Sequence, residues 1–177
     1  MNDLTIVSTV AVGDIGAELK LGTLSDDLDV YSCRYNPTDS PGLYLQFYKS
    51  GPTITLFRTG SFNIRGSSSN EEIQENKELL ENEFSKMGID TSIGDANLTN
   101  IVFTANLDKQ VDLNRASIKL GLERIEYEPE QFPGLVYRLE LGVVLIFSSG
   151  NLVLTGFTEI EDAQQAYNKL KLELEDD

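Results

Sequence analysis

The sequence contains no histidine and a single cysteine among its 177 residues. Without histidine, neither a Ser-His-Asp nor a Cys-His catalytic arrangement can form, and histidine-ligated metal sites are excluded. The lone Cys33 rules out an intrachain disulfide framework and is typical of a reducing compartment. We expect it to be a small buried or strand residue and not a reactive thiol.

Several binding motifs are also missing. The chain has no Gly-x-x-x-x-Gly-Lys-Ser/Thr phosphate loop, no Gly-x-Gly-x-x-Gly after a strand, and no Asp-x-Asp-x-Asp-Gly calcium loop. Glu128 and Glu130 form a carboxylate pair, but they lie in a turn-like segment without a partner acid. We therefore predict that the chain is not an enzyme and that it uses no metal or cofactor.

Long apolar runs and a leader segment are absent as well. No stretch approaches the roughly 18 apolar residues that a membrane span needs. The start, Met1-Asn2-Asp3, lacks the basic region and apolar core of a signal peptide. We expect a cytoplasmic protein that does not contact membranes.

Positive charge is scarce. Lysine and arginine total 14 against 29 aspartate and glutamate residues, which gives a net charge of −15 and a pI near 4.3. Such a chain repels nucleic acid at low salt unless its cations gather on one surface. The acidity is spread along the chain, which favours adaptation to concentrated salt, where a screening length of roughly 3 Å at 1 M weakens self-repulsion. The alternative is an acidic surface for a basic partner.

What the sequence does contain is an internal repeat. Residues 127–135 (Tyr-Glu-Pro-Glu-Gln-Phe-Pro-Gly-Leu) match residues 35–43 (Tyr-Asn-Pro-Thr-Asp-Ser-Pro-Gly-Leu) at an offset of 92. Residues 147–156 match residues 57–66 at an offset of 90. Such a repeat implies two equivalent units related by pseudo-symmetry. We place the first repeat at residues 1–92 and the second at 93–177.

Each repeat shows the same order of structural signals. A β-prone run (4–12 and 98–107) precedes a segment with helical spacing (19–28 and 113–122). Four strand signals bounded by Pro and Gly follow, at 30–36, 43–48, 53–58 and 61–66, and at 123–128, 134–141, 143–147 and 151–156. A closing helix begins at the expected cap Asn70 and ends before Gly88 in the first repeat. In the second it begins at a Thr158/Glu161 capping box and runs towards Leu174.

This β-α-β-β-β-β-α order predicts an α+β fold, with both repeats in one long antiparallel sheet and the helices on a single face. Period-2 alternation then predicts which side chains point to the other, uncovered face. In the second repeat these are Asn100, Val102, Leu145, Phe147, Val153 and Thr155. In the first repeat, Phe47 and Phe62 should point to the helices instead. A face with this much apolar surface needs a partner.

Two strings carry a family resemblance: Glu-Pro-x-x-Phe-Pro-Gly-Leu-Val-Tyr-Arg at 128–138 and Ile-Phe-x-Ser-Gly-x-x-Val-Leu-Thr-Gly at 146–156. With their weaker copies in the first repeat, they resemble the core domain of the TATA-box-binding protein family in its archaeal form, over essentially the whole chain. The resemblance implies a pseudo-symmetric saddle with a curved sheet and helices on its convex face. It also implies minor-groove binding with phenylalanine wedges, for which this family is itself the standard example.

The resemblance assigns roles to particular residues. Phe132 and Phe147 would be wedges beside Pro133, and Val102, Leu145 and Val153 would give apolar contact. Asn100 and Thr155 would donate the central hydrogen bonds, and Arg138 would contact a phosphate. Glu128 and Glu130 would hold transcription factor B. The implied partners are therefore TATA-like promoter DNA and that factor.

The first repeat departs from this pattern. Ser40 stands in the place of Phe132, so that Phe57 is the single wedge left. Thr5 stands where the family has asparagine, and Thr55 replaces the counterpart of Leu145. Asn63 and Arg65 stand in the places of Val153 and Thr155. The remaining DNA-binding candidates in this repeat are Val7, Phe57 and Arg65, whose guanidinium suits a phosphate or a narrow A·T groove.

The sequence is compatible with two functions. The first is an initiation factor that binds and bends TATA-type DNA, as a monomer or a weak homodimer, and recruits transcription factor B. The second is a divergent paralogue that acts as a protein-interaction module and has lost autonomous TATA recognition through its polar first repeat. We favour the first.

Overall fold

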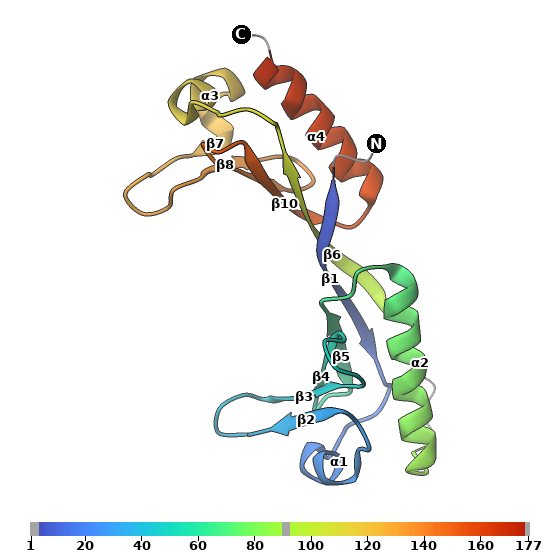
Figure 1. Cartoon of the computed structure of the whole chain (residues 1–177). Helices are drawn as coiled ribbons and strands as arrows, with labels where there is room; N and C mark the ends of the chain where they lie inside the picture. Colours follow the sequence, from blue (N-terminus) through green and yellow to red (C-terminus); the bar gives the residue numbers. More distant parts are fainter. Residues whose placement is uncertain (1–3, 90–92, 176–177) are drawn as a thin grey trace. The chain divides into compact units, whose positions relative to one another are not determined.

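The computed structural model describes residues 4–89 and 93–175. Its strands are β1 (Thr5–Asp14), β2 (Ser32–Tyr35), β3 (Gly42–Gln46), β4 (Thr53–Phe57), β5 (Ser61–Arg65), β6 (Asn97–Asn106), β7 (Ile125–Glu126), β8 (Leu135–Arg138), β9 (Val143–Ile146) and β10 (Asn151–Phe157). Its helices are α1 (Leu21–Asp27), α2 (Asn70–Lys86), α3 (Leu113–Leu120) and α4 (Ile160–Glu175), with a 3₁₀ turn η1 (Leu122–Arg124). The predicted order of elements is confirmed in both repeats (Figure 1).

The strands form one ten-stranded sheet in the order β2-β3-β4-β5-β1-β6-β10-β9-β8-β7, which confirms the predicted α+β class. The chain separates into two compact units, Ser8–Thr99 and Met1–Val7 together with Asn100–Asp177. We call them the N-terminal and the C-terminal unit. Strands β1 and β6 each contribute residues to both units.

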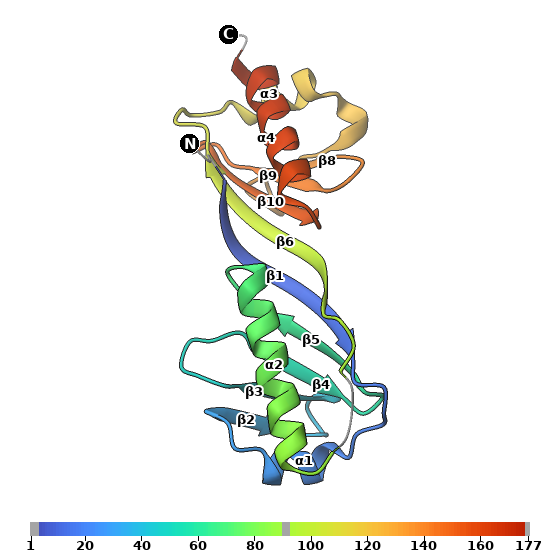
Figure 2. The ribbon, with the colours of Figure 1, turned by 90° about the vertical axis from the view of Figure 1, so that its right-hand side faces the viewer.

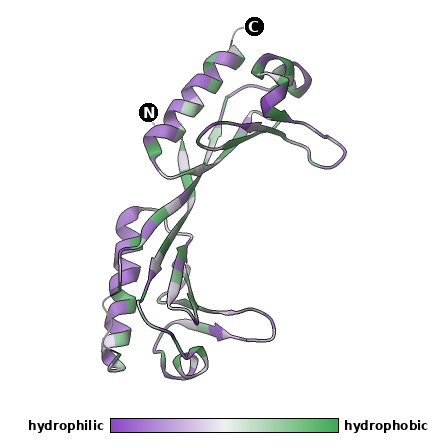
Figure 3. Cartoon of the chain, turned by 180° about the vertical axis from the view of Figure 1, so that it is seen from behind, coloured by the Kyte–Doolittle hydropathy of each residue, from purple (hydrophilic) through white to green (hydrophobic). Residues whose placement is uncertain are grey.

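In the N-terminal unit, helix α2 lies across the strands (Figure 2). The buried core combines alternate residues of the strands, Leu43, Leu45, Ile54, Leu56, Phe62 and Ile64, with Ile73, Leu80 and Phe84 of α2. Phe62 is 1% exposed and Phe47 packs against this core, so their predicted direction towards the helices is confirmed. Burying one such side chain contributes about 1.5–3 kcal/mol. Most residues of α2 are hydrophilic (Figure 3).

The C-terminal unit follows the same plan. Helix α4 contacts β10, and α3 contacts both α4 and β8. The strands bury Leu135, Tyr137, Val144, Ile146, Leu152 and Leu154, and α4 buries Tyr167 and Leu170. Asp112 caps α3 by accepting hydrogen bonds from the amides of Asn114 and Arg115. In both units the opposite face of the strands is left without a helix, as far as the described residues extend.

Two local expectations were wrong. The strand expected at 123–128 is reduced to Ile125–Glu126, because Gly121, at a φ of 89°, leads into the 3₁₀ turn η1. Helix α2 is capped by Ser69 and not by Asn70, since the Ser69 hydroxyl accepts the amide of Glu72 at 3.2 Å. Asn70 is instead the first helical residue.

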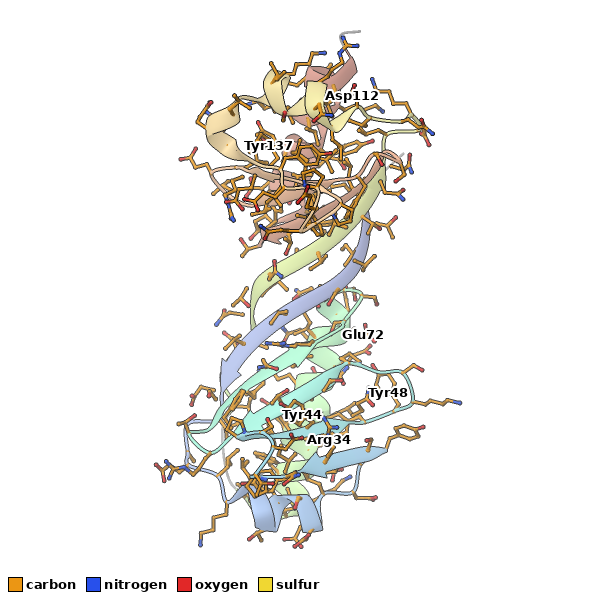
Figure 4. The ribbon with its side chains drawn as sticks, turned by 90° about the vertical axis from the view of Figure 1, so that its left-hand side faces the viewer. Arg34, Tyr44, Tyr48, Glu72, Asp112 and Tyr137 are labelled. Carbon is orange, nitrogen blue, oxygen red and sulfur yellow. The ribbon has the colours of Figure 1, made fainter. Side chains whose placement is uncertain are left out.

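The start of α2 also holds the β3–β4 loop. The Glu72 carboxylate accepts the Ser68 amide and the hydroxyl of Tyr48, which in turn accepts the side-chain amide of Asn76 (Figure 4). Hydrogen bonds from Ser68 lower the pKa of Glu72, and burial raises the pKa of Tyr48. Within residues 4–89 and 93–175, no helix is long and apolar enough to cross a membrane.

The cap assignment is testable. Ser69→Ala should lower the free energy of unfolding by about 1 kcal/mol, because the Glu72 amide loses its acceptor. The matched control Asn70→Ala should change it by less than about 0.5 kcal/mol. Urea unfolding followed by circular dichroism, at one salt concentration, measures both. A larger loss in the Asn70 variant would contradict the assignment.

Candidate nucleic-acid interface

We call the uncovered side of the strands in each unit its free face. In the C-terminal unit, β10 pairs Val153 with Leu145 of β9 and with Thr104 of β6. Val102, Leu145 and Val153 are partly exposed, whereas their neighbours along the strands are buried. The outward directions expected for these residues are confirmed. Their role in binding remains a prediction.

Asn100 lies on this face with a fixed amide. Its Oδ1 accepts the backbone amide of Gly156 at 2.7 Å and the hydroxyl of Thr155 at 3.3 Å. The interaction depends on a bulge in β10 between Leu154 and Phe157, where Gly156 adopts a φ of 85°. Because the oxygen is occupied, the NH₂ group of Asn100 is the part left to donate to a ligand.

Phe132 and Phe147 form a pair of rings beside the free face. Their centroids are 5.8 Å apart with planes at 67°, an edge-to-face arrangement. The rings close over Gly134, where an added Cβ would lie 2.7 Å from Phe132 and 3.0 Å from Phe147. Phe132 is 37% exposed, so part of this apolar pair faces solvent. The structure therefore brings the two predicted wedges together.

The turn before Phe132 carries the acidic candidates. The carbonyl of Glu128 accepts the amides of Gln131 and Phe132, which folds the segment tightly. Glu128, Glu130 and Pro133 are all exposed on this turn. The Glu128 carboxylate also accepts the side-chain amide of Gln131. The turn thus presents two carboxylates and a ring side by side.

Arg138 is engaged within the protein. Its Nε and Nη2 donate to the two carboxylate oxygens of Glu126 at 2.8 and 3.1 Å. These hydrogen bonds lower the pKa of Glu126 below its usual range. Both side chains are more than half exposed, so solvent screens the pair. A phosphate contact by Arg138 would compete with this ion pair.

In the N-terminal unit, strand register changes which residues of β1 correspond to Asn100 and Val102. Asn63 of β5 pairs with Val12, as Val153 of β10 pairs with Thr104. Val12 of β1 therefore corresponds to Thr104 of β6. Two residues earlier in each strand, Val10 corresponds to Val102, and four residues earlier, Ser8 corresponds to Asn100. The offset is 92, the same as between the tyrosines at 35 and 127.

The candidates Val7 and Thr5 do not have these positions. Ala11 pairs with the buried Ile64, and Val7 alternates in step with Ala11 and Thr9 and not with Ser8 and Val10, although the Val7 side chain itself is 52% exposed. The expectation that Thr5 replaces the asparagine was therefore wrong in register. It arose because Ile6-Val7 resembles Ile101-Val102. The offset of 92 residues between the two repeats, applied to β1 and β6, would have identified Ser8 and Val10.

A polar cluster replaces the wedge pair in the N-terminal unit. Ser40 Oγ and the Tyr44 hydroxyl lie 2.7 Å apart, and the guanidinium of Arg34 stacks 5.2 Å from the centre of the Tyr44 ring (Figure 4). At the turn glycine, Gly42, an added Cβ would lie 3.4 Å from the Phe57 ring and 2.6 Å from the Thr55 methyl group, so a single ring and a methyl group stand where the other repeat has two rings. The backbone turn is the same as in the other repeat, since the Asn36 carbonyl accepts the amides of Asp39 and Ser40. Sequence reasoning missed Tyr44 and Arg34.

The part of this free face formed by β3, β4 and β5 is polar as well. Tyr44 pairs with Thr55 across β3 and β4, where the other repeat pairs Val136 with Leu145. Thr55 is only 5% exposed, although we expected its side chain to point outward to solvent. Arg65 is exposed at the end of β5. The Gln46 side chain, the counterpart of Arg138, donates to the Gly51 carbonyl.

The described residues contain no group of three or more acidic, cysteine or histidine side chains placed to hold a metal. Cys33 is partly exposed on β2, and burial raises the pKa of its thiol.

A family model described as "Transcription factor TFIID (or TATA-binding protein, TBP)" matches residues 3–86 and again residues 95–176. The chain belongs to the TATA-box-binding protein family. The predicted resemblance is confirmed, and the two matched segments agree with the internal repeat. Because this is a family of transcription factors, the prediction that the chain is not an enzyme is confirmed too.

Relatives within the family match this chain over more than nine tenths of its length. TATA-box-binding protein C of Halobacterium salinarum is 42% identical over 167 residues, 92% of each chain. The TATA-box-binding protein of Archaeoglobus fulgidus is 37% identical over 97% of this chain and 94% of its own. The solved structure of Methanococcus jannaschii TBP has a TM-score of 0.83 at 34% identity, covering 98% of this chain and 99% of that one.

The Glu126–Arg138 pair gives a prediction. Arg138→Gln should raise the pKa of Glu126 towards its ordinary value, because the charged donor is lost. Arg138→Lys should raise it less. A pH titration of the Glu126 carboxyl carbon by NMR measures the shift, and an unchanged midpoint in Arg138→Gln would exclude the pair in solution.

Proposed function

We propose that this protein is an initiation factor that binds TATA-type promoter DNA in the minor groove, bends it, and recruits transcription factor B. The observation that supports this most is the exposed Phe132–Phe147 pair beside an apolar, uncovered sheet face. The names of its relatives in the TATA-box-binding protein family agree with the proposal.

The free face of the C-terminal unit suits an A·T minor groove. That groove presents acceptors, adenine N3 and thymine O2, and lacks the guanine amino group. Val102, Leu145 and Val153 can contact its floor closely, and the NH₂ group of Asn100 can donate to one acceptor. Since Asn100 is already held by Gly156, little orientational freedom is lost on binding.

The ring pair supplies the bend. Inserting an apolar side chain between base pairs costs a few kcal/mol per unstacked step, and contact along the bent groove offsets the cost. Phe132 and Phe147 insert together at the end contacted by the C-terminal unit, with Pro133 beside them. At the other end Phe57 stands without a ring partner, so we expect a weaker kink there.

The N-terminal unit contributes Phe57 and Arg65 to this interface. We place Val10, which has the register position of Val102, in the role first given to Val7. The net charge of −15 opposes DNA until salt screens it. We therefore expect the tightest binding at higher salt than is usual for DNA-binding proteins, with one protein monomer on each site.

The acidic turn is the proposed site for transcription factor B. Glu128 and Glu130 are exposed and held by a folded backbone, so they can meet a basic surface with little loss of freedom. The corresponding turn of the first repeat carries Asn36 and Thr38 at these positions. This difference gives the factor a preference for the C-terminal unit.

DNA binding is tested with a labelled TATA duplex between 0.1 and about 3 M salt. Phe147→Ala should weaken binding roughly ten- to a hundredfold, or about 1.4–2.8 kcal/mol, and reduce bending measured by energy transfer between end labels. Leu79→Ala is the control, because Leu79 is an apolar residue of α2 that is 37% exposed and lies outside the proposed interface. Equal affinity for TATA and scrambled duplexes at every salt concentration would refute this part.

Recruitment is tested with the double variant Glu128→Lys/Glu130→Lys. It should bind the TATA duplex at least as well as the parent, because negative charge is removed, but should lose the ternary complex with transcription factor B. Glu75→Lys/Glu78→Lys on the exposed side of α2 makes the same charge change elsewhere. A gel-shift titration of the factor separates the two. Loss of the ternary complex in both variants would point to net charge alone.

A second function is favoured by the polar cluster of Arg34, Tyr44 and Ser40. If the protein binds transcription factor B without DNA and no duplex binds alone, it acts as a protein-interaction module, and the cluster is then part of a protein contact.

A further inference from the structure

The free face of the N-terminal unit contains an unpaired amide oxygen. Asn63 Oδ1 is buried and has no hydrogen-bond partner among the described residues. The other unpaired buried side-chain atoms described, Ser67 Oγ and Asn76 Oδ1, belong to residues that are themselves fully buried. Asn63 differs, because its side chain is partly exposed and lies on the uncovered side of β5. An unpaired amide oxygen costs about 1–3 kcal/mol and calls for an explanation.

The position of Asn63 is set by three strands. It lies between Val12 of β1 and Thr55 of β4, in the register that Val153 has between Thr104 and Leu145. Its neighbours Phe62 and Ile64 are buried at 1% and 0% exposure, so alternation fixes its direction. The two repeats therefore place an amide and a valine at the same point of their free faces.

These two side chains meet a base pair differently. A valine packs against the floor of an A·T minor groove, but it offers no acceptor to the amino group of guanine, which protrudes there. An amide can donate to adenine N3 or thymine O2, and after half a turn about its last torsion it can accept from the guanine amino group. That torsion is broad and roughly two-fold. Because Asn63 Oδ1 has no hydrogen-bond partner among the described residues, rotating the amide breaks no hydrogen bond at this oxygen.

We propose that Asn63 is a specificity-determining residue that lets the N-terminal unit accept a G·C base pair where the C-terminal unit requires A·T. The inference rests on the proposed function, since it needs the free face to contact the minor groove. The neighbouring residues agree with it. Thr55 and Arg65 replace an apolar residue and a threonine on the same face, so the surface is polar on the β4 side of Asn63 and at the end of β5, while Val12 of β1 flanks its other side.

The ligand is therefore a duplex site of unequal halves. One half is A·T-rich, and the other carries a G·C pair opposite Asn63. A wrong base pair at an ordinary position weakens binding by about 5- to 150-fold, equivalent to about 1–3 kcal/mol. We expect the penalty at the Asn63 position to be less than about threefold.

The test compares three kinds of duplex. The parent duplex carries the unchanged TATA site. The one-half duplex has a single A·T pair replaced by G·C in one half of the site, and the two-half duplex has the same replacement at the mirror positions of both halves; each position is tested in turn. This design does not depend on which way the protein lies on the DNA. The wild type should bind the one-half duplex almost as well as the parent duplex, and should bind the two-half duplex at least tenfold more weakly.

Two reciprocal variants identify the residue. Asn63→Val should lose tolerance, so that the one-half duplex is bound at least tenfold more weakly than the parent duplex. Val153→Asn should gain it, so that the two-half duplex is bound nearly as well as the one-half duplex. Both changes lie on the partly exposed side of a strand, and thermal unfolding checks that each variant is folded.

The outcomes separate the inference from the proposed function. If no duplex binds at any salt concentration, the proposed function fails. If the TATA duplex binds but every G·C replacement carries the same penalty in the wild type and in Asn63→Val, the role of Asn63 is refuted while the proposed function stands. Tolerance that persists in Asn63→Val also refutes it, and assigns the effect to another residue of this face.

Discussion

Strand register is the constraint on which the functional surface depends. Helices bury one side of the strands in each unit, so every strand must place its apolar residues on that side, and every second residue is left for the other. A shift by an odd number of residues exchanges the two sets. The pairing of Val12 with Asn63, and of Thr104 with Val153, therefore decides which residues can meet a ligand.

Much of this could be read from the sequence, because the buried side of the sheet repeats strongly. The order of elements, the core position of Phe62 and the outward Leu145 and Val153 all follow from alternation. The predictions that were wrong concerned places where the local sequence did not distinguish between two alternatives. The strings at Ile6-Val7 and Ile101-Val102 look alike although their registers differ, and neither Ser69 nor Asn70 is a poor cap. The cluster around Tyr44 could not be predicted, since it depends on side chains from separate strands and a turn.

The two repeats share a backbone and differ in chemistry. Their turns fold in the same way, with one carbonyl accepting two amides, yet one turn presents two glutamates and a ring while the other presents Thr38 and Ser40. On the faces beside them, Leu145 opposite Val136 corresponds to Thr55 opposite Tyr44. In the first repeat the larger side chain of this pair is therefore on β3, whereas in the second it is on β9. The hydrogen bond between Ser40 and Tyr44 stands in place of the contact between two rings. The free faces of the two units therefore differ in chemistry although their strand pairing is the same.

The contact between Ser40 and Tyr44 also limits how this protein can change by mutation. Restoring a phenylalanine at residue 40 would remove the partner of the Tyr44 hydroxyl and bring a second ring towards a site beside Tyr44. Replacing Tyr44 by valine first would leave Thr55 beside a gap. Residues in contact are not additive in their effects. Substitutions at residues 40, 44 and 55 should therefore be coupled in their effect on stability, so a second ring at residue 40 is best accommodated when all three positions change together.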